Sequence, residues 1–255
     1  MAAAADPTSE DALLGGKLTL RQPLRGHRFG HDAVLLAAAT PARTGEHAIE
    51  LGAGVGAAGL ALARRVEGLA VTLLELDRNL AALARENAAR NALADRVRVV
   101  CLDVAAPVAQ FADAGLALDS ADHVLMNPPF NAPHNPSPDQ ARRLAHAVSP
   151  GTLARWIDTA ARLLRPQGTL TLIWRADGLA DLVAALASGF GAIAIVPVYP
   201  KPGAAAIRVL VSAAKSSNEP LSILPGLVLA DGDNKPSAQA NAILRNGAAL
   251  ILTAR

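Results

Sequence analysis

The chain carries the stretch Ala48-Ile-Glu-Leu-Gly-Ala-Gly-Val-Gly-Ala-Ala-Gly59 between a short apolar run and a run rich in alanine and leucine. Its four glycines predict a tight turn from a strand into a helix, because glycine adopts the backbone angles of such a turn and leaves room for a ligand. Glu75 follows Gly56 by 19 residues, at the end of the next apolar run. A carboxylate there can accept both hydrogen bonds of a ribose diol. The stretch therefore predicts a nucleotide-like cofactor.

The glycines alone leave the class of cofactor open. The pattern Gly54-x-Gly56-x-x-Gly59 also satisfies the fingerprint of flavin and nicotinamide oxidoreductases. Such a turn can also bind a cofactor without catalysis, or serve packing alone. Glu50, just before the glycines, would repel a pyrophosphate but suits a cationic cofactor. S-adenosylmethionine, which carries a sulfonium and an ammonium group, is such a cofactor.

Apolar runs typical of strands alternate with amphipathic runs, which predicts an α/β fold with a parallel sheet covered by helices. The expected strands span residues 47–51, 70–76, 97–102, 123–126, 169–174, 193–198 and 207–212. The expected helices span residues 60–66, 79–91, 150–164 and 179–187. The last two strands are joined by a segment too short for a crossover helix, so they should pair antiparallel. The predicted fold is Rossmann-like, with a seven-stranded, mainly parallel sheet, one antiparallel strand and helices on both faces.

The chain is expected to form one domain. Residues 1–16 are predicted to be a flexible tail, residues 17–255 a single domain, and residues 214–255 an extension packed on it, with a short helix over 236–245. The first ten residues lack the basic start and apolar core of a signal peptide. The protein is therefore predicted to be cytoplasmic.

Composition limits the remaining classes. Hydrophobic residues make up 51% of the chain and charged residues 18%, which excludes disorder for all but the ends. The formal net charge of +2 permits nucleic acid as a partner without requiring it. Cys101 lies in an apolar run and is predicted to be a buried strand residue. The six histidines show no metal-ligand spacing, so no metal is predicted.

The quartet Asn127-Pro128-Pro129-Phe130 directly follows an expected strand and predicts an acceptor site at the carboxyl edge of the sheet. The prolines restrict the backbone, so the Asn127 amide is aimed. Acceptance of an amine's two hydrogens by this amide oxygen and by the Pro128 carbonyl would turn the nitrogen lone pair toward a methyl donor. Phe130 would stack on an extruded base. The chemistry predicted is methylation of a planar nitrogen.

Together with the glycine turn, the quartet resembles the amino-methyltransferases of the class I fold. The segment Gly26-His-Arg-Phe-Gly-His-Asp-Ala-Val-Leu-Leu36 and the end of the chain, residues 236–245, resemble the bacterial tRNA1(Val) adenine-N6 methyltransferases. This likeness spans about residues 18–250. It implies S-adenosylmethionine as methyl donor and methylation of the adenosine beside the anticodon. Phe130 replaces a tyrosine often seen in the family, and His31 stands where a small hydroxyl residue is expected.

The residues predicted to act at the site combine the turn, the strand ends and this resemblance. Those predicted to bind the cofactor are Arg28, Phe29, Asp32, Glu50, Gly52, Gly54, Gly56, Glu75, Leu76, Asp103, Val104 and Asn127. Those predicted to act on the acceptor are Asn127, Pro128, Pro129 and Phe130. Asp103 has the alternative interpretation of a surface cap, and Asp77 that of a residue that begins a helix.

The predicted macromolecular partner is tRNA, with no membrane. The basic cluster proposed to contact it consists of Arg21, Arg25, Arg28, Arg142, Arg143, Lys201 and Arg208. A protein glutamine or another RNA base amine is the nearest alternative acceptor, because each presents the same planar nitrogen. About 46 residues precede the first expected strand, which is short for a separate substrate domain of the glutamine-modifying kind.

Overall fold

The computed structural model describes residues 7–25, 28–129, 151–233 and 235–252. Its central sheet has the strand order β10-β8-β9-β7-β6-β3-β4-β5, with β11 also paired to β8. The strands are β3 (His47–Leu51), β4 (Ala70–Glu75), β5 (Val97–Cys101), β6 (Ala121–Met126), β7 (Leu164–Arg175), β8 (Phe190–Tyr199), β9 (Arg208–Lys215), β10 (Ser222–Ile223) and β11 (Leu227–Val228). All seven expected strands form and the predicted fold class is confirmed, but the sheet has nine strands rather than seven, because the short strands β10 and β11 also pair with β8.

One strand of this sheet is reversed, as the short connection between the last two expected strands predicts. β9 pairs antiparallel with both β7 and β8, whereas β3 pairs parallel with β4 and β6. The partners Pro197 and Val209 lie opposite each other in the β8–β9 hairpin. The remaining strands therefore point their carboxyl ends toward one edge of the sheet.

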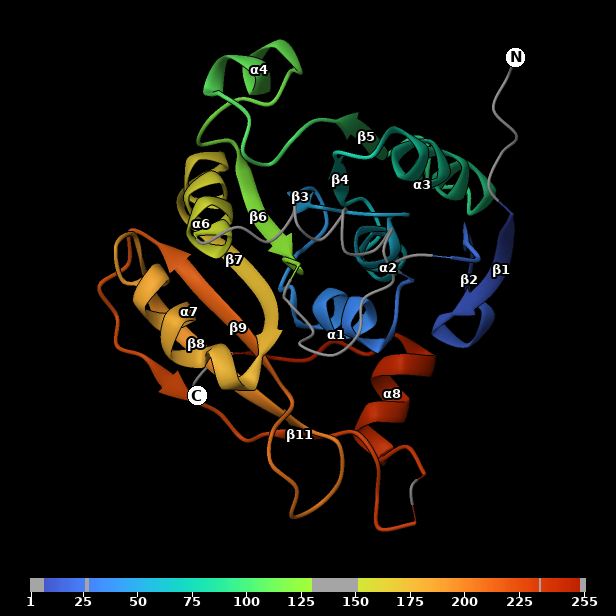
Figure 1. Ribbon diagram of the computed structural model, residues 1–255, viewed down its shortest axis with the longest axis vertical. Coiled ribbons are helices and arrows are strands. Elements are labelled where there is room, and N and C mark those ends of the chain that lie inside the picture. The colour runs from blue at the N-terminus through green and yellow to red at the C-terminus, as the bar shows by residue number, and fades with distance from the viewer. Residues whose placement is uncertain (1–6, 26–27, 130–150, 234, 253–255) are drawn as a thin grey trace.

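Helices cover both faces of the sheet (Figure 1). They are α1 (His31–Ala39), α2 (Ala57–Arg65), α3 (Arg78–Arg90), α4 (Val108–Asp113), α6 (Thr152–Leu163), α7 (Leu179–Leu186) and α8 (Ala238–Asn246). One buried cluster gathers side chains of α1, α2, α3 and α8, and a second gathers those of α4, α6 and α7. Alternate residues of β3 face the two clusters: Ala48 belongs to the first, whereas Ile49 and Leu51 belong to the second.

The expectation of a flexible tail over residues 1–16 is wrong for the part that the structure describes. β1 (Thr8–Leu13) pairs antiparallel with β2 (Leu18–Pro23), joined by the turn η1 (Leu14–Gly16). Burial explains this order, since Leu18 and Leu20 of β2 are fully buried in the first cluster. The polar pattern of the first strand conceals its pairing, because only one of its six residues, Leu13, is buried.

One further difference lies in local detail. Cys101 is exposed, contrary to the expectation of burial, because β5 is the terminal strand of the sheet. The expected helix over 150–164 is observed as α6, and its expected first residue, Pro150, lies outside the described residues.

The segment after β9 returns to β8 and then to the first buried cluster. β10 and β11 add to the outer side of β8, and α8 places Ile243 in the first buried cluster. Leu250 N–H donates a hydrogen bond to the Ala38 carbonyl of α1 at 2.8 Å. Within the described part of the chain, none of the helices combines the length and the apolar character needed to cross a bilayer.

Candidate active site

The carboxyl edge of the sheet brings three of the predicted site residues into register. Leu51 of β3 is the register partner of both Met126 of β6 and Leu74 of β4. The residues that follow these partners are Gly52, Asn127 and Glu75. Asn127 and Glu75 therefore lie on either side of the glycine turn, roughly 10 Å apart at the spacing of adjacent strands.

The glycine turn has one position that opens to free space. Gly52 and Gly54 have φ values of +67° and +56°, which side-chain-bearing residues rarely adopt. A Cβ built on Gly52 would lie 2.3 Å from the ring of Trp156, whereas a Cβ on Gly54 would have nothing within 4 Å. Gly54 is therefore the place where a ligand can come closest to the backbone of the turn.

Two buried carboxyl groups anchor this turn. Glu75 accepts hydrogen bonds from Gly54 N–H at 2.7 Å and from Asp77 N–H at 2.8 Å, and burial raises its pKa above the usual range. Glu50 accepts a hydrogen bond from Gly59 N–H at 2.7 Å. Burial, with a smaller contribution from the nearby Glu75, raises the pKa of Glu50 to about 8. A pair of poorly solvated carboxyl groups suits a cationic ligand.

Asn127 presents an unused acceptor. Its Oδ1 atom is buried and has no hydrogen-bond partner among the described residues. Leaving such an atom unpaired costs about 1–3 kcal/mol, and a hydrogen donor of a ligand would remove that cost. Pro128 is buried beside it, and Pro129 is half-buried. Phe130, the last member of the predicted quartet, lies outside the described residues.

The upstream residues predicted to bind the cofactor are engaged within the protein. Arg28 forms an ion pair with Asp11 at 2.9 Å, and Asp32 forms one with Arg208 at 3.0 Å. Phe29 packs, partly buried, against the first cluster. These contacts position the segment that leads into α1.

The other predicted site residues, which follow β4 and β5, differ in exposure. Asp103 is exposed and its Oδ1 accepts a hydrogen bond from Ala105 N–H at 2.8 Å, a turn contact compatible with the cap interpretation. Val104 is buried, whereas Leu76, directly after Glu75, is 62% exposed. Asp77 begins α3, as one interpretation of the sequence predicts, and its side chain accepts hydrogen bonds from the N–H groups of Asn79 and Leu80.

Two residues at this edge escaped prediction as site residues. Trp156 belongs to no motif of the sequence that indicates a site, and its ring lies against Gly52. Asn87 looked like an ordinary polar residue of a helix, yet it is fully buried and donates a hydrogen bond to the Val55 carbonyl in the glycine turn. The signal available for Asn87 was its place on the same helical face as the buried Ala84 and Ala88.

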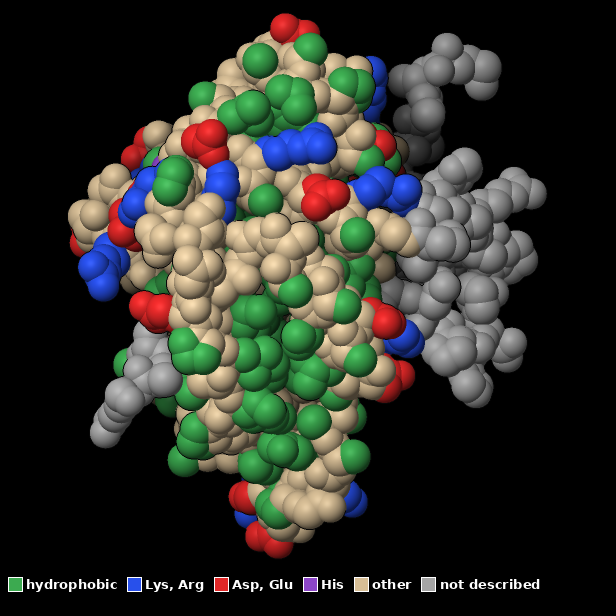
Figure 2. Space-filling view, turned by 90° about the vertical axis from the view of Figure 1, so that its left-hand side faces the viewer, with side chains coloured by type: hydrophobic (Ala, Val, Ile, Leu, Met, Phe, Trp, Pro, Cys, Tyr) green, Lys and Arg blue, Asp and Glu red, His purple; other side chains and the backbone are tan. Residues whose placement is uncertain are grey.

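Most of the predicted basic cluster that the structure describes is already paired with carboxylates. Arg21 forms an ion pair with Glu86 at 2.7 Å, as Arg28 and Arg208 do with their own acids. Arg25 and Lys201 are exposed, and Arg142 and Arg143 lie outside the described residues. On the side of the molecule that carries α6 and α7, basic and acidic side chains are interspersed around a central hydrophobic area (Figure 2).

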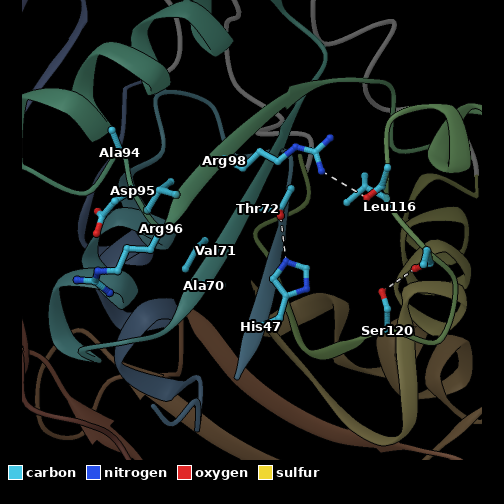
Figure 3. Close-up of a pocket in the computed structure, with 13 residues that line it drawn as sticks. His47, Ala70, Val71, Thr72, Ala94, Asp95, Arg96, Arg98, Leu116 and Ser120 are labelled. Carbon is cyan, nitrogen blue, oxygen red and sulfur yellow. Dashed lines mark hydrogen bonds between the residues drawn. The ribbon is translucent and has the colours of Figure 1, made fainter. Parts of the chain in front are cut away.

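A cavity of about 610 Å³ lies at the opposite, amino edge of the sheet (Figure 3). Two of its polar lining residues are paired within the protein: His47 Nε2 pairs with Thr72 Oγ1 at 2.9 Å, and Arg98 donates to the carbonyls of Ala114 and Gly115. This cavity is separated from the glycine turn by the length of the strands. Among the described residues, no three His, Cys, Asp or Glu side chains are grouped to hold a metal, and the absence of a metal stays a prediction.

Comparison with known proteins agrees with this geometry. The methyltransferase small domain family matches residues 28–201. The tRNA1(Val) (adenine(37)-N6)-methyltransferase of Bacteroides thetaiotaomicron is 31% identical over 188 residues, covering 72% of this chain and 76% of that protein. The protein of the same name from Dickeya chrysanthemi is 28% identical over 246 residues, covering 92% and 95%. A solved structure of a predicted O-methyltransferase from Agrobacterium tumefaciens is 31% identical, with a TM-score of 0.73 and coverage of 86% and 98%.

Proposed function

This chain belongs to the methyltransferase small domain family, and we propose that it transfers the methyl group of S-adenosylmethionine to the N6 amine of an adenosine in tRNA. Family membership makes the chain an S-adenosylmethionine-dependent methyltransferase, and the identity of the acceptor is the proposed part. The names of the relatives favour the adenosine at position 37, beside the anticodon of a valine tRNA. A tRNA substrate would be met in the cytoplasm, where we propose that the protein acts.

The observation that carries the proposal is the buried, unpaired Oδ1 of Asn127. The exocyclic amine of adenine is a poor nucleophile, because its lone pair is delocalised into the ring. Oδ1 of Asn127 and the carbonyl of Pro128 can accept the two amine hydrogens, which favours a more tetrahedral nitrogen. The lone pair would then point across the edge of the sheet toward the glycine turn. The chain needs no general base, since the proton can leave for solvent after the transfer.

The residues around the turn fit the cofactor. When bound, S-adenosylmethionine supplies an electrophilic methyl group on a sulfonium centre. Gly54 leaves space at the turn, Glu75 has further lone pairs to accept from the ribose hydroxyls, and the exposed Leu76 offers an apolar surface to the adenine ring. Glu50 lies on the side of the turn that faces α2, and a cationic cofactor would favour the ionised form of its carboxyl group. Asp103 and Val104 lie after β5, where the adenine end of the cofactor would lie.

RNA binding is proposed to involve the exposed cations first. Arg25 and Lys201 can reach phosphates without breaking an ion pair of the described residues, whereas Arg21, Arg28 and Arg208 would have to leave or share their acids. We propose that the latter three contribute less to RNA affinity. Stacking of the target base on Phe130 stays part of the proposal.

The test uses a methyl-labelled donor and two transcripts of valine tRNA, with adenosine or guanosine at position 37. Label is expected in the adenosine transcript alone and is expected to be lost after ribonuclease digestion. Asn127→Ala should lose turnover with at most a small loss of affinity for S-adenosylhomocysteine, because the role proposed for Oδ1 is toward the acceptor amine. Equal labelling of both transcripts, label retained in protein after digestion, or full activity of the Asn127→Ala variant would each refute the proposal.

A further inference from the structure

Asn87 is a fully buried amide on α3 that joins two segments far apart in the sequence. Its Oδ1 accepts a hydrogen bond from Arg21 N–H at 2.8 Å. Its Nδ2 donates to the Arg21 carbonyl at 2.9 Å and to the Val55 carbonyl at 3.0 Å. One side chain therefore pairs with β2 of the N-terminal hairpin and with the glycine turn.

The bond to Val55 restrains one peptide group of that turn. Its carbonyl oxygen is held by Asn87, and the N–H of the same peptide, which belongs to Gly56, donates to the Ala53 carbonyl at 2.8 Å. Gly56 has a φ of +88° and directly precedes α2. Because glycine tolerates either sign of φ, this peptide could turn over at low cost if one of the two anchors were lost. Asn87 thus helps to set the direction of the turn beside the open position at Gly54.

Asn91 provides a natural comparison on the same helix. Its Oδ1 accepts from Thr19 N–H at 3.0 Å, and its Nδ2 donates to the Thr19 carbonyl at 2.9 Å and to the Asn87 carbonyl at 2.8 Å. Both asparagines therefore hold the edge of β2 as a neighbouring strand would. Of these two asparagines, only Asn87 also donates a hydrogen bond to the glycine turn in the described part of the chain.

We propose that Asn87 is a positioning residue for cofactor binding, through which the β1–β2 hairpin holds the Val55–Gly56 peptide in the orientation that the cofactor requires. This inference rests on the proposed function, because it takes the glycine turn as the cofactor site. It makes the hairpin part of the cofactor-binding unit, although the hairpin lies outside the central sheet. Its consequence is that cofactor affinity depends on Asn87 but not on Asn91.

The test compares Asn87→Ala with the matched variant Asn91→Ala in the full chain. Both variants are expected to lower the melting temperature, since both remove hydrogen bonds to β2. Only Asn87→Ala should raise the Kd for S-adenosylhomocysteine, measured by calorimetry, by about tenfold, the loss expected for one buried hydrogen bond. Equal Kd values in the two variants would overturn the inference. Absence of binding to the wild-type protein would refute the proposed function itself.

A second measurement needs no variant and covers the case in which Asn87→Ala fails to fold. Hydrogen exchange of the wild-type protein is followed with and without S-adenosylhomocysteine. Amides of the glycine turn should exchange more slowly when the compound is bound, and the Arg21 amide of β2 should be protected with them, because it donates to Asn87. Protection of the turn with unchanged exchange at Arg21 would contradict a role for the hairpin.

Discussion

A carboxyl oxygen of Glu50 accepts a hydrogen bond from the backbone N–H of Gly59 at 2.7 Å, which joins the end of β3 to the first turns of α2. A side chain at position 59 would occupy this space, since a Cβ there would lie 2.7 Å from Glu50 Oε2. The bond fixes a buried carboxyl group beside the glycine turn, which is the proposed cofactor site. Glu50 is only 5% exposed, so its ionisation must affect the stability of the fold.

The first prediction concerns stability above neutral pH. The unfolded carboxyl of Glu50 ionises near pH 4.5, whereas the folded one keeps its proton until about pH 8. Between pH 4.5 and 8 the folded protein therefore binds more protons, and its free energy of unfolding should fall as pH rises, by up to roughly 5 kcal/mol over that interval and by roughly 1 kcal/mol of it above pH 7. Urea unfolding of the wild type and of Glu50→Gln between pH 7 and 9 measures the effect. Glu50→Gln should lose most of the decline.

The window is chosen to separate Glu50 from other groups. Burial lowers the pKa of His47 from its ordinary value of 6.5, so the titration of His47 changes the free energy of unfolding only at lower pH than this window. Glu75, whose pKa burial also raises, is present in both proteins, so the comparison between them reports on Glu50. The same decline in both proteins would show that Glu50 is already ionised in the folded state.

The second prediction concerns the open position of the turn. Gly54→Ala places a methyl group in space that the proposed cofactor fills, at a strain of about 1 kcal/mol for a left-handed backbone. Gly45→Ala is the matched control, because Gly45 also has a positive φ and nothing within 4 Å but precedes β3 at the opposite edge. The melting temperature should fall by a similar amount in both variants. Calorimetry should show weaker binding of S-adenosylhomocysteine in Gly54→Ala alone. Undiminished binding there would remove Gly54 from the site.

Much of the candidate site could be predicted from the sequence, because apolar runs indicate the strands and the glycines that follow one of them indicate the carboxyl edge of a parallel sheet. Glu75 and Asn127 stand at strand ends in the sequence, so their common edge follows from the topology. The antiparallel β8–β9 pair follows from the length of its connection. These features depend on the local spacing of apolar residues and glycines, which can be read directly from the sequence.

The rest depends on contacts between distant segments. Asn87 is buried because β2 lies against α3, and nothing in the polar sequence of the first strand indicates that hairpin. Cys101 is exposed because β5 ends the sheet, a property of strand order rather than of its apolar neighbours. The partners of Arg28 and Asp32 were likewise beyond prediction, since each pairs with a residue from another segment.

The third prediction concerns the contact between Gly52 and Trp156. A methyl group at Gly52 would lie 2.3 Å from the indole ring and would occupy a left-handed backbone, so Gly52→Ala should cost about 2–4 kcal/mol of unfolding free energy. Trp156→Leu removes the ring and should relieve part of that cost in the double variant. Chemical unfolding of the four proteins gives a coupling energy, expected to be at least about 1 kcal/mol. Gly54→Ala with Trp156→Leu should be additive, and strict additivity for Gly52 would contradict the contact.

The fourth prediction concerns proton release on cofactor binding. A sulfonium or ammonium group near Glu50 and Glu75 favours their ionised forms, so binding should lower the raised pKa of Glu50. Below about pH 8 the free protein carries the proton and must release it, and affinity for S-adenosylmethionine should therefore increase as pH rises from 6 to 8. Calorimetry in buffers of different ionisation enthalpy counts the protons released. Glu50→Gln should bind with little pH dependence in this range, and an unchanged pH profile in that variant would assign the released proton to another group.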